Sequence, residues 1–340
     1  MSLRFGFGHV PAEHYAKHVE LVQLGERLGF DSAWLADQTF FRDPYVVLAA
    51  IALATERIDL GIGVTNPYTR HPAMAARAIA TLADMAPGRI TLGVGAGNVK
   101  EMLHPLALED RPVAARCREM VELVRAALTA EPVDYHGPHY QMAGARLETD
   151  AGAGVPIYVA GRGQRVLAAA GAVADGVLVG GLCDEPGIAY ALDRIARGAH
   201  GRGRDPGSLA ICSWVTVYLT DDRDRAIAET APMIAHIIGG APDHVLEAIG
   251  LADTTWRAIK STYRRDGIPE AAALVTEACA DAFAIVGDAD ECVRRIRALE
   301  HAGVTEFIFL LPKNADVDEQ RSHLEHFADS VLSAFRVPAC

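Results

Sequence analysis

The sequence lacks any long apolar run, and none reaches the roughly 18 residues that a membrane-spanning helix needs. Its first residues also lack the basic segment, apolar core and small-residue cleavage site of an export signal. The six cysteines are scattered, without a CxxC pair or a Cys/His spacing typical of structural zinc. Such scattered cysteines favour free thiols in a reducing compartment. These absences predict a cytoplasmic protein that does not bind a membrane.

Positive charge is also scarce, since 32 Lys and Arg residues stand against 44 Asp and Glu residues and the formal net charge is −12. This balance opposes binding to nucleic acid or to anionic lipid, although a local basic pocket for a phosphate-bearing small molecule remains possible. The 13 histidines include no HExxH motif, and no GxGxxG motif of a dinucleotide-binding fold occurs. We therefore expect a small-molecule substrate, no nucleic-acid partner and no metal centre.

Short apolar runs alternate with longer segments of helical period, which is typical of βα units around a parallel sheet. Eight strands with intervening helices favour an α/β fold of the (β/α)8 barrel type over an open doubly wound sheet. The predicted strands are 3–8, 32–36, 58–64, 89–94, 156–160, 176–179, 209–218 and 306–311.

Residues 1–340 are thus predicted to form a single barrel domain that exceeds the roughly 250 residues of a typical barrel. The excess should lie in insertions, of which the largest candidate is 221–283, between the seventh and eighth strands. We expect this insertion to be helical and to cover the barrel mouth. A second irregular segment, 131–154, suggests a turn with short extended pieces.

Polar residues and glycines follow several predicted strands, and a barrel gathers such positions around one mouth. His9 and His71, after the first and third strands, are candidates for proton transfer, with a structural role as the equal alternative for each. An N-cap role for Asp37 and a turn at Asn66-Pro67 are similarly ordinary alternatives. The mouth set comprises Asp37, Gln38, Thr65, Asn66, Gly97, Asn98, Gly161, Arg162, Gly163, Gln164, Gly180 and Gly181.

Two glycine-rich segments suggest contact with a ligand. GVGAGN, at 93–98, follows the fourth strand, where bare backbone would let a ring or substrate pack closely. GRGQRV, at 161–166, ends a strand and begins a helix, so its amides and the helix N-terminus offer a place for an anion. Arg162 and Arg165 add positive charge there, and a plain turn with solvated arginines is the alternative. We interpret this segment as the site of a cofactor phosphate.

Four segments carry a family resemblance: LADQ at 35–38, GVTNPYTRHP at 63–72, GRITLGVGAGN at 88–98, and VAGRGQRVLAAAGAVADGVLVGG at 159–181. Together they resemble the bacterial luciferase-like superfamily, which includes flavin-dependent monooxygenases and oxidoreductases that use the deazaflavin coenzyme F420. The 63–72 run is most similar to methylenetetrahydromethanopterin reductases and their F420-linked relatives. The resemblance extends over essentially the whole chain and implies a (β/α)8 barrel with an insertion.

The resemblance implies roles for individual residues. A non-prolyl cis peptide is expected between Gly63 and Val64, behind the cofactor ring. Asp37 resembles the acidic residue that hydrogen-bonds the ring or its surroundings, and Thr65 and Asn66 continue the loop that faces the cofactor. The segments that hold the phosphate side of the cofactor match Gly161, Arg162, Gly163, Gln164, Gly180 and Gly181.

The sequence departs from its relatives at two positions of this mouth. Gln38 stands where many relatives have a histidine, and Asn98 stands where the sugar-phosphate dehydrogenases of the group have a glutamate. Neither side chain is an ordinary acid or base, which puts the acid–base pair of that dehydrogenase reaction in doubt. With His9 and His71, Gln38 and Asn98 form the candidate catalytic set, and Asn98 also belongs to the cofactor-facing set.

These observations predict an oxidoreductase that transfers a hydride between F420 and a small organic substrate. A luciferase-like monooxygenase that uses FMN and dioxygen is the first alternative, because the two classes share the fold and the loop positions. A non-catalytic cofactor-binding protein is the second, because Gln38 and Asn98 replace acid–base residues. Relatives often form dimers through barrel helices, so we also expect a homodimer.

Overall fold

Eight parallel strands close into a barrel in the computed structural model, which describes residues 2–97, 99–109, 112–149, 154–312 and 315–336. Pairing of β11 with β1 and of β8 with β9 completes the ring. The predicted (β/α)8 barrel is confirmed, and every predicted strand agrees with the structure to within one residue at each end. In order around the barrel, the strands are β1 (Arg4–His9), β2 (Ser32–Leu35), β3 (Asp59–Thr65), β4 (Ile90–Val94), β7 (Ile157–Gly161), β8 (Gly176–Gly180), β9 (Ala210–Leu219) and β11 (Glu306–Leu310).

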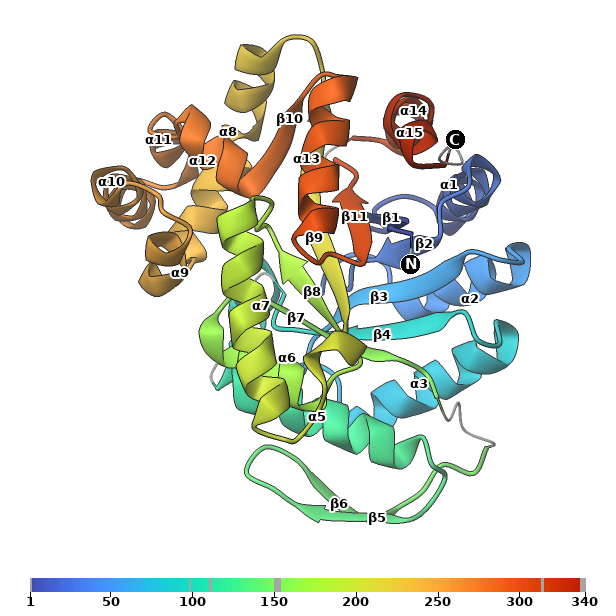
Figure 1. Ribbon diagram of the computed structural model, residues 1–340. Coiled ribbons are helices and arrows are strands. Elements are labelled where there is room, and N and C mark those ends of the chain that lie inside the picture. The colour runs from blue at the N-terminus through green and yellow to red at the C-terminus, as the bar shows by residue number, and fades with distance from the viewer. Residues whose placement is uncertain (1, 98, 110–111, 150–153, 313–314, 337–340) are drawn as a thin grey trace.

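Helices connect the strands and cover the outside of the barrel (Figure 1). Local signals set their ends. Asp43 accepts a hydrogen bond from the Tyr45 amide at the start of the second helix, and Gly29, with φ of 88°, ends the first. The covering helices are α1 (Tyr15–Leu28), α2 (Pro44–Ala54), α3 (Pro72–Met85), α5 (Val113–Ala127), α6 (Gln164–Val173), α7 (Glu185–His200), α13 (Ala289–His301) and α14 (Val317–Phe327), and the shorter α4 (Val99–Met102) and α15 (Ser333–Arg336) complete the set.

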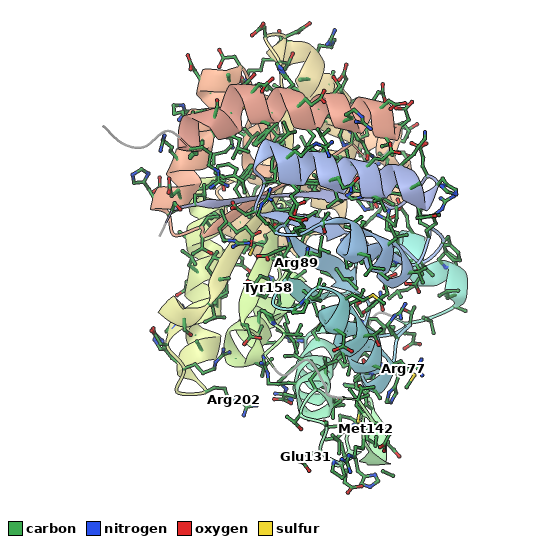
Figure 2. The ribbon with its side chains drawn as sticks, turned by 90° about the vertical axis from the view of Figure 1, so that its right-hand side faces the viewer. Arg77, Arg89, Glu131, Met142, Tyr158 and Arg202 are labelled. Carbon is green, nitrogen blue, oxygen red and sulfur yellow. The ribbon has the colours of Figure 1, made fainter. Side chains whose placement is uncertain are left out.

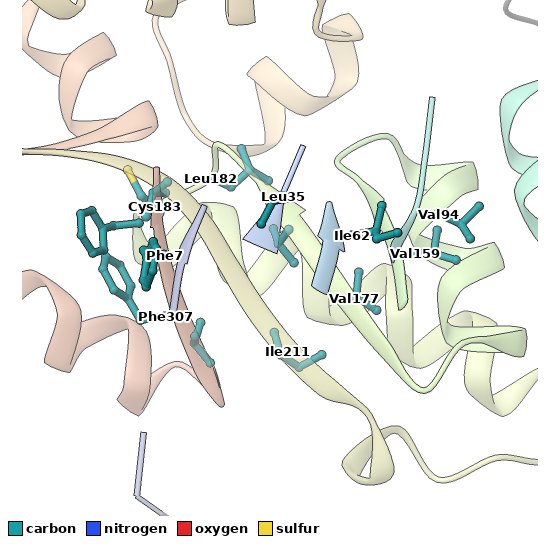
Figure 3. Close-up of a cluster of buried hydrophobic side chains, with 14 of the residues drawn as sticks. Phe7, Leu35, Ile62, Val94, Val159, Val177, Leu182, Cys183, Ile211 and Phe307 are labelled. Carbon is teal, nitrogen blue, oxygen red and sulfur yellow. The ribbon is translucent and has the colours of Figure 1, made fainter. Parts of the chain in front are cut away.

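Hydrophobic side chains pack on both sides of the barrel wall. The larger core lies between strands and helices, and Figure 3 shows part of it, with Phe7, Ile62 and Val177 among its members. The smaller core brings together Trp34, Leu178, Cys212 and Ile308 from four different strands, so these side chains face the barrel axis. Because successive residues of a strand point to opposite faces, these two sets define which residues of every strand point inward.

Two excursions leave the barrel. The irregular segment forms an antiparallel hairpin, β5 (Val133–His136) and β6 (Gln141–Ala145), which projects at the end marked by Met142 and Glu131 in Figure 2. The segment predicted as an insertion is helical, and its helices gather at one side of the molecule (Figure 1). They are α8 (Arg223–Gly240), α9 (Asp243–Ala248), α10 (Asp253–Arg265), α11 (Ile268–Ala272) and α12 (Glu277–Phe283).

One strand, β10 (Ala284–Gly287), was not predicted from the sequence. It pairs in parallel with the distal residues of β9, from Thr216 to Leu219, which extend past the barrel. β10 has only four residues and follows α12 directly, so its sequence carries no separate strand signal. It forms a strand because β9 is long enough to pair with it. Among the described residues, no helix combines the length and the apolar composition that a membrane crossing requires.

Candidate functional site

Glycine lines the carboxyl-terminal mouth of the barrel, where several strands end on an inward-facing glycine. A Cβ atom at Gly8 or Gly63 would lie 3.1 or 2.5 Å from the indole of Trp214, whereas nothing lies within 4 Å of one at Gly180. Trp214 in turn packs edge-on against Trp34, with ring centroids 6.1 Å apart. The floor of the mouth is therefore a flat indole with bare backbone beside it, which is a surface that accepts a planar ring.

The end of β3 carries the predicted irregularity. Its pairing register with β4 shifts between Ile62 and Thr65, and the Gly63–Val64 peptide is cis, as the family resemblance implied. The bulge turns Val64 inward as well, so that its methyl groups lie against Gly93 and Gly95. Gly63 and Val64 are thus both at the floor of the mouth.

Thr65 and Asn66 follow the bulge, and both side chains are buried and hydrogen-bonded. The Thr65 hydroxyl pairs with the phenol of Tyr45. Asn66 donates to the carbonyl of Ala96 at 2.8 Å and accepts from the Tyr68 amide at 2.8 Å. These bonds join the loop after β3 to α2 and to the loop after β4, so the two side chains shape the mouth.

An ionic cluster flanks the bulge at the end of β2. Burial raises the pKa of the Asp37 carboxyl to about 6; nearby Arg70 opposes this rise and Asp43 adds to it. Arg70 lies on the face of the Tyr45 ring, 4.1 Å from its centroid, and pairs with Asp43 at 2.8 Å. Sequence reasoning identified only Asp37 here. Arg70 stood inside the GVTNPYTRHP segment, but its partners come from a different loop and helix.

The four candidate catalytic residues, Gln38, His71, Asn98 and His9, differ in where they lie. Gln38 follows Asp37, and its backbone carbonyl accepts a hydrogen bond from the Phe41 amide. His71 caps α3, because its Nδ1 accepts from the Ala73 amide at 3.2 Å, and its ring meets Tyr140 edge-on. Asn98 lies outside the described residues.

His9 lies on the outer face of β1, in line with Phe5 and Phe7, and therefore behind the barrel wall. Its ring stacks on His18 of α1, with centroids 5.1 Å apart. Burial and the neighbouring His18 lower the pKa of His9 to about 3, and neither buried ring nitrogen has a hydrogen-bond partner among the described residues. The structure does not bring His9 to the mouth, so we leave it out of the proposed site.

The segment after β7 presents an unsatisfied cation. Nη1 of Arg162 is buried, and no described residue accepts a hydrogen bond from it. Burial lowers the pKa of this guanidinium to about 10. A Cβ atom at Gly181, where φ is 69°, would lie 3.5 Å from Nη1. Gly163 precedes α6 without capping it through a side chain. An anion at this point would meet a guanidinium and a helix N-terminus together.

The helical excursion contacts the same segments of the mouth. Met233 of α8 places its sulfur 3.0 Å from the Thr216 hydroxyl of β9, and Ile237 lies beside Gly181. His244 of α9 points its Nε2 at the Gln164 amide, at 3.5 Å, and Pro242 lies near Gly163. Sequence reasoning missed His244, because its position depends on packing between segments about 80 residues apart. Within the described ranges, no three His, Cys, Asp or Glu side chains form a metal-binding group.

Comparisons with known proteins identify the family of the chain. A family model described as luciferase-like monooxygenase matches residues 2–306. The 5,10-methylenetetrahydromethanopterin reductase of Methanolobus tindarius is 32% identical over 307 residues, which cover 90% of this chain and 93% of the relative. The F420-dependent glucose-6-phosphate dehydrogenase of Beutenbergia cavernae is 31% identical over 349 residues, covering 98% of each chain.

Solved structures extend the comparison. The coenzyme F420-dependent tetrahydromethanopterin reductase from Methanopyrus kandleri superposes with a TM-score of 0.85 at 29% identity, covering 99% of this chain and 100% of that one. A monooxygenase from Streptomyces bottropensis has a TM-score of 0.72 at 21% identity, covering 98% of this chain and 100% of that one, a likeness of fold alone. The flavin monooxygenases are thus the more distant group.

Proposed function

The chain belongs to the luciferase-like monooxygenase family, and from that premise we propose that it transfers a hydride between coenzyme F420 and a small organic substrate at the barrel mouth. The relatives with 31–32% identity include a 5,10-methylenetetrahydromethanopterin reductase and an F420-dependent dehydrogenase. The chain is thus an F420-dependent oxidoreductase.

The observation that carries this proposal is the buried Nη1 of Arg162, which has no hydrogen-bond acceptor among the described residues. A buried cation without an acceptor is costly unless a ligand supplies the acceptor. The phosphate of F420 is such a ligand, and Gly163, Gln164 and Gly181 surround the same point. The open backbone at Gly180 and the Trp214 floor leave room for a planar ring. The described residues therefore fit F420, with Gly161 and Gly180 completing the cradle.

The residues of the chain would bind and orient the reactants. F420, when bound, supplies the hydride at C5 of its deazaflavin ring. We place Gly63 and Val64 behind the ring, with Thr65 and Asn66 shaping the loop beside it. Asp37, whose pKa of about 6 lies near neutrality, would hold a hydrogen bond or a proton at its carboxyl oxygens, facing the polar edge of the ring.

The remaining mouth residues are assigned to the substrate side. Gln38, His71 and Asn98 are the candidates for substrate contact, since their positions in the sequence follow β2, β3 and β4. The 221–283 insertion, which lies against Thr216, Gly181 and Gln164, would cover the mouth and exclude water during hydride transfer.

Titration of the purified protein with F420 and with FMN tests the proposal. We expect saturable F420 binding, at least tenfold tighter than FMN binding, with quenching of the fluorescence of Trp214 near the ring. Arg162→Met should weaken F420 binding at least tenfold because the phosphate loses its charged partner. Arg165→Met, which removes an exposed arginine from the same helix turn, is the matched control and should bind as the wild type does. Micromolar affinity for FMN alone would contradict the proposal.

The outer face of α2 supports a homodimer, which we propose as the working assembly. Val46 and Leu53 expose 71% and 74% of their surface on this helix, and Phe40 exposes 61% just before it. A helix that is apolar on all sides is normally covered on all sides, and a second copy of the chain would cover this one. The five cysteines within the described ranges are free and buried, which fits the reducing cytoplasm that we propose as its location.

A further inference from the structure

A cavity of about 210 Å³ lies at the opposite end of the barrel from the proposed active site. Its wall is built from the first residues of several strands, among them Arg4 of β1, Ser32 of β2, Asp59 of β3, Ala210 of β9 and Glu306 of β11. The amino-terminal end of a barrel is normally closed by packed side chains. Here the small residues Ser32, Gly61 and Ala210 leave space between the larger side chains of the lining, so this end of the barrel is hollow.

Glu306 provides the chemistry of the cavity. Its side chain is buried, with 5% of the residue exposed, and points inward from the start of β11. The Ser32 hydroxyl donates to one carboxyl oxygen, and the thiol of Cys212 lies 3.6 Å from the other. Both of these partners are neutral. Burial raises the pKa of the Glu306 carboxyl, and the Ser32 hydrogen bond and the charge of Arg4 offset only part of that rise. A further cation beside the carboxylate would offset more of it.

Arg4, which lines the cavity, interacts with both Glu306 and Asp59. Arg4 forms its ion pair with Asp59, and both side chains are partly exposed, at 46% and 35%, where the cavity opens to solvent. The same guanidinium also approaches the backbone carbonyl of Asp31. The charged lining thus contains two carboxylates and one guanidinium, which interacts with both carboxylates, so the lining is one positive charge short.

Two aromatic rings form the side of the cavity above Glu306. Trp34 and Tyr158 lie with their ring centroids 5.9 Å apart, and both belong to the lining. The indole nitrogen of Trp34 donates to Ser32 at 3.0 Å, which fixes the ring beside the carboxylate. Aromatic faces next to a carboxylate form the arrangement that attracts an organic cation, through cation–π and ionic terms together.

We propose that this amino-terminal cavity binds a small organic cation, an alkylammonium whose charged group pairs with Glu306 and whose carbon chain lies against Trp34 and Tyr158. The size of the ligand follows from the volume, since a cavity of about 150 Å³ in another protein accommodates benzene. A primary amine with roughly five to eight non-hydrogen atoms fits this space. The site lies apart from the mouth residues, so it stands whether or not the chain uses F420.

Calorimetric titration of the full chain with n-butylammonium chloride tests the proposal, with n-butanol as the uncharged ligand of equal length. We expect saturable binding of butylammonium and at least tenfold weaker binding of butanol. Glu306→Gln should lower the affinity for butylammonium at least tenfold, because the amide keeps the shape and loses the charge. Glu131→Gln, an exposed change on the distant hairpin segment, is the control and should leave the affinity unchanged.

Ala210→Met is a second variant that keeps the proposal testable if Glu306→Gln does not fold. It leaves Glu306 in place and fills the cavity from β9, so it should abolish butylammonium binding. Equal binding of butylammonium and butanol, unchanged affinity in both variants, or the absence of saturation in the wild type would each contradict the proposal.

Discussion

His9 and His71 show how differently two histidines at strand ends are used. His71 is exposed, and its Nδ1 accepts a hydrogen bond from the first turn of α3. His9 is 3% exposed and stacks on His18 without a hydrogen-bond partner for either ring nitrogen among the described residues. The buried arrangement of His9 strongly disfavours a positive charge on its ring.

Acid sensitivity at His9 follows from that burial. The pKa of His9 is about 3 in the folded protein, against an ordinary value of 6.5. Between about pH 6.5 and pH 3, His9 is therefore protonated in the unfolded chain and neutral in the folded chain. As the pH falls through this range, the free energy of unfolding decreases by about 1.4 kcal/mol per pH unit. His9→Phe should reduce the stability loss between pH 7 and pH 5 by about 2 kcal/mol, as measured by urea unfolding at both values.

The matched control is His136→Phe, at an exposed position of the hairpin. It should leave the acid sensitivity of the wild type intact. An unchanged pH dependence in His9→Phe would show that the buried ring accepts a proton at little cost.

Asp37 presents the opposite case, a carboxyl group that resists ionisation. Its pKa of about 6 exceeds the ordinary 3.8, so ionisation lowers the stability of the folded state as pH rises from about 4 to above 6. Asp37→Asn should therefore stabilise the free protein at pH 8 by about 2 kcal/mol and have little effect at pH 4. The same variant should bind F420 more weakly, because stability is commonly sacrificed at functional sites.

Asp43→Asn is the contrasting variant. Asp43 caps α2 and pairs with Arg70, so this change should lower the stability of the protein. Thermal unfolding at the two pH values measures both variants. A destabilised Asp37→Asn at pH 8 would mean that Arg70 outweighs the burial of the carboxylate.

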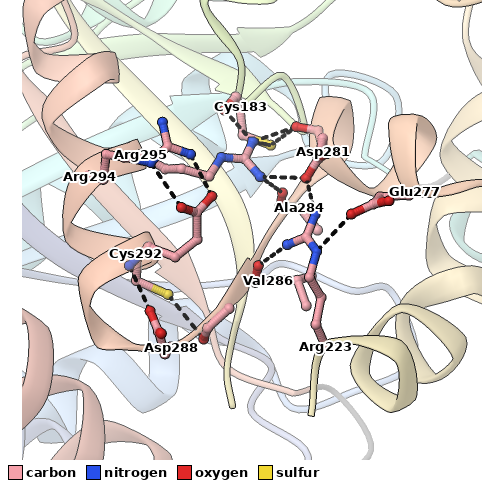
Figure 4. Close-up of polar contacts among 12 residues, drawn as sticks. Cys183, Arg223, Glu277, Asp281, Ala284, Val286, Asp288, Cys292, Arg294 and Arg295 are labelled. Atoms are coloured by element: carbon pink, nitrogen blue, oxygen red, sulfur yellow. Dashed lines mark hydrogen bonds and ion pairs between the residues drawn. The ribbon is translucent and has the colours of Figure 1, made fainter. Parts of the chain in front are cut away.

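At the scale of elements, a buried arginine attaches the helical insertion to the barrel (Figure 4). Arg295 of α13 donates to the carbonyls of Ala284 and Cys183, at 3.0 and 3.1 Å, and pairs with Asp281 of α12 at 3.2 Å. Asp281 also pairs with Arg223 of α8 at 2.6 Å. One carboxylate therefore joins the first and last helices of the insertion to a helix of the barrel.

Removal of this carboxylate charge should loosen the insertion. Asp281→Asn leaves the buried Arg295 guanidinium without its anion, which we expect to cost about 2 kcal/mol. Hydrogen exchange should accelerate in α8, α12 and β10 more than in the barrel strands. Glu277→Gln removes a pair of Arg223 in which the glutamate side chain is 69% exposed, and it should cost under about 0.5 kcal/mol. Equal losses in the two variants would contradict the central role of Asp281.

At the scale of the whole molecule, the proposed dimer makes a direct prediction. Val46→Glu together with Leu53→Glu places charge on the exposed apolar face of α2, so it should convert a dimer to a folded monomer. Leu274→Glu, at a partly exposed position of the insertion, should leave the dimer intact. Sedimentation at several concentrations distinguishes the two masses. A wild type that sediments as a monomer throughout would remove the dimer from the proposal.

The positions of the strands could be predicted from the local sequence pattern, whereas the contacts between distant side chains could not. The eight barrel strands follow from apolar runs between glycines, and their bounds agree to within one residue. β10 was not predicted because its partner is the part of β9 that extends past the barrel. The inward or outward direction of His9 was legible in principle, since Phe5 and Phe7 alternate with glycines and place His9 on the outer face. That alternation was the missed signal.

The sequence by itself determined the barrel class, the strand order, the mouth segments and the family, because these depend on local periodicity and on short motifs. Only the tertiary structure decided which side chains meet. Arg70 reaches Asp43 and Tyr45 across 27 and 25 positions of the chain, and Ser32 reaches Glu306 across 274. Such contacts depend on strand register and on the closure of the barrel, which act on all strands at once and leave no local trace in any one of them.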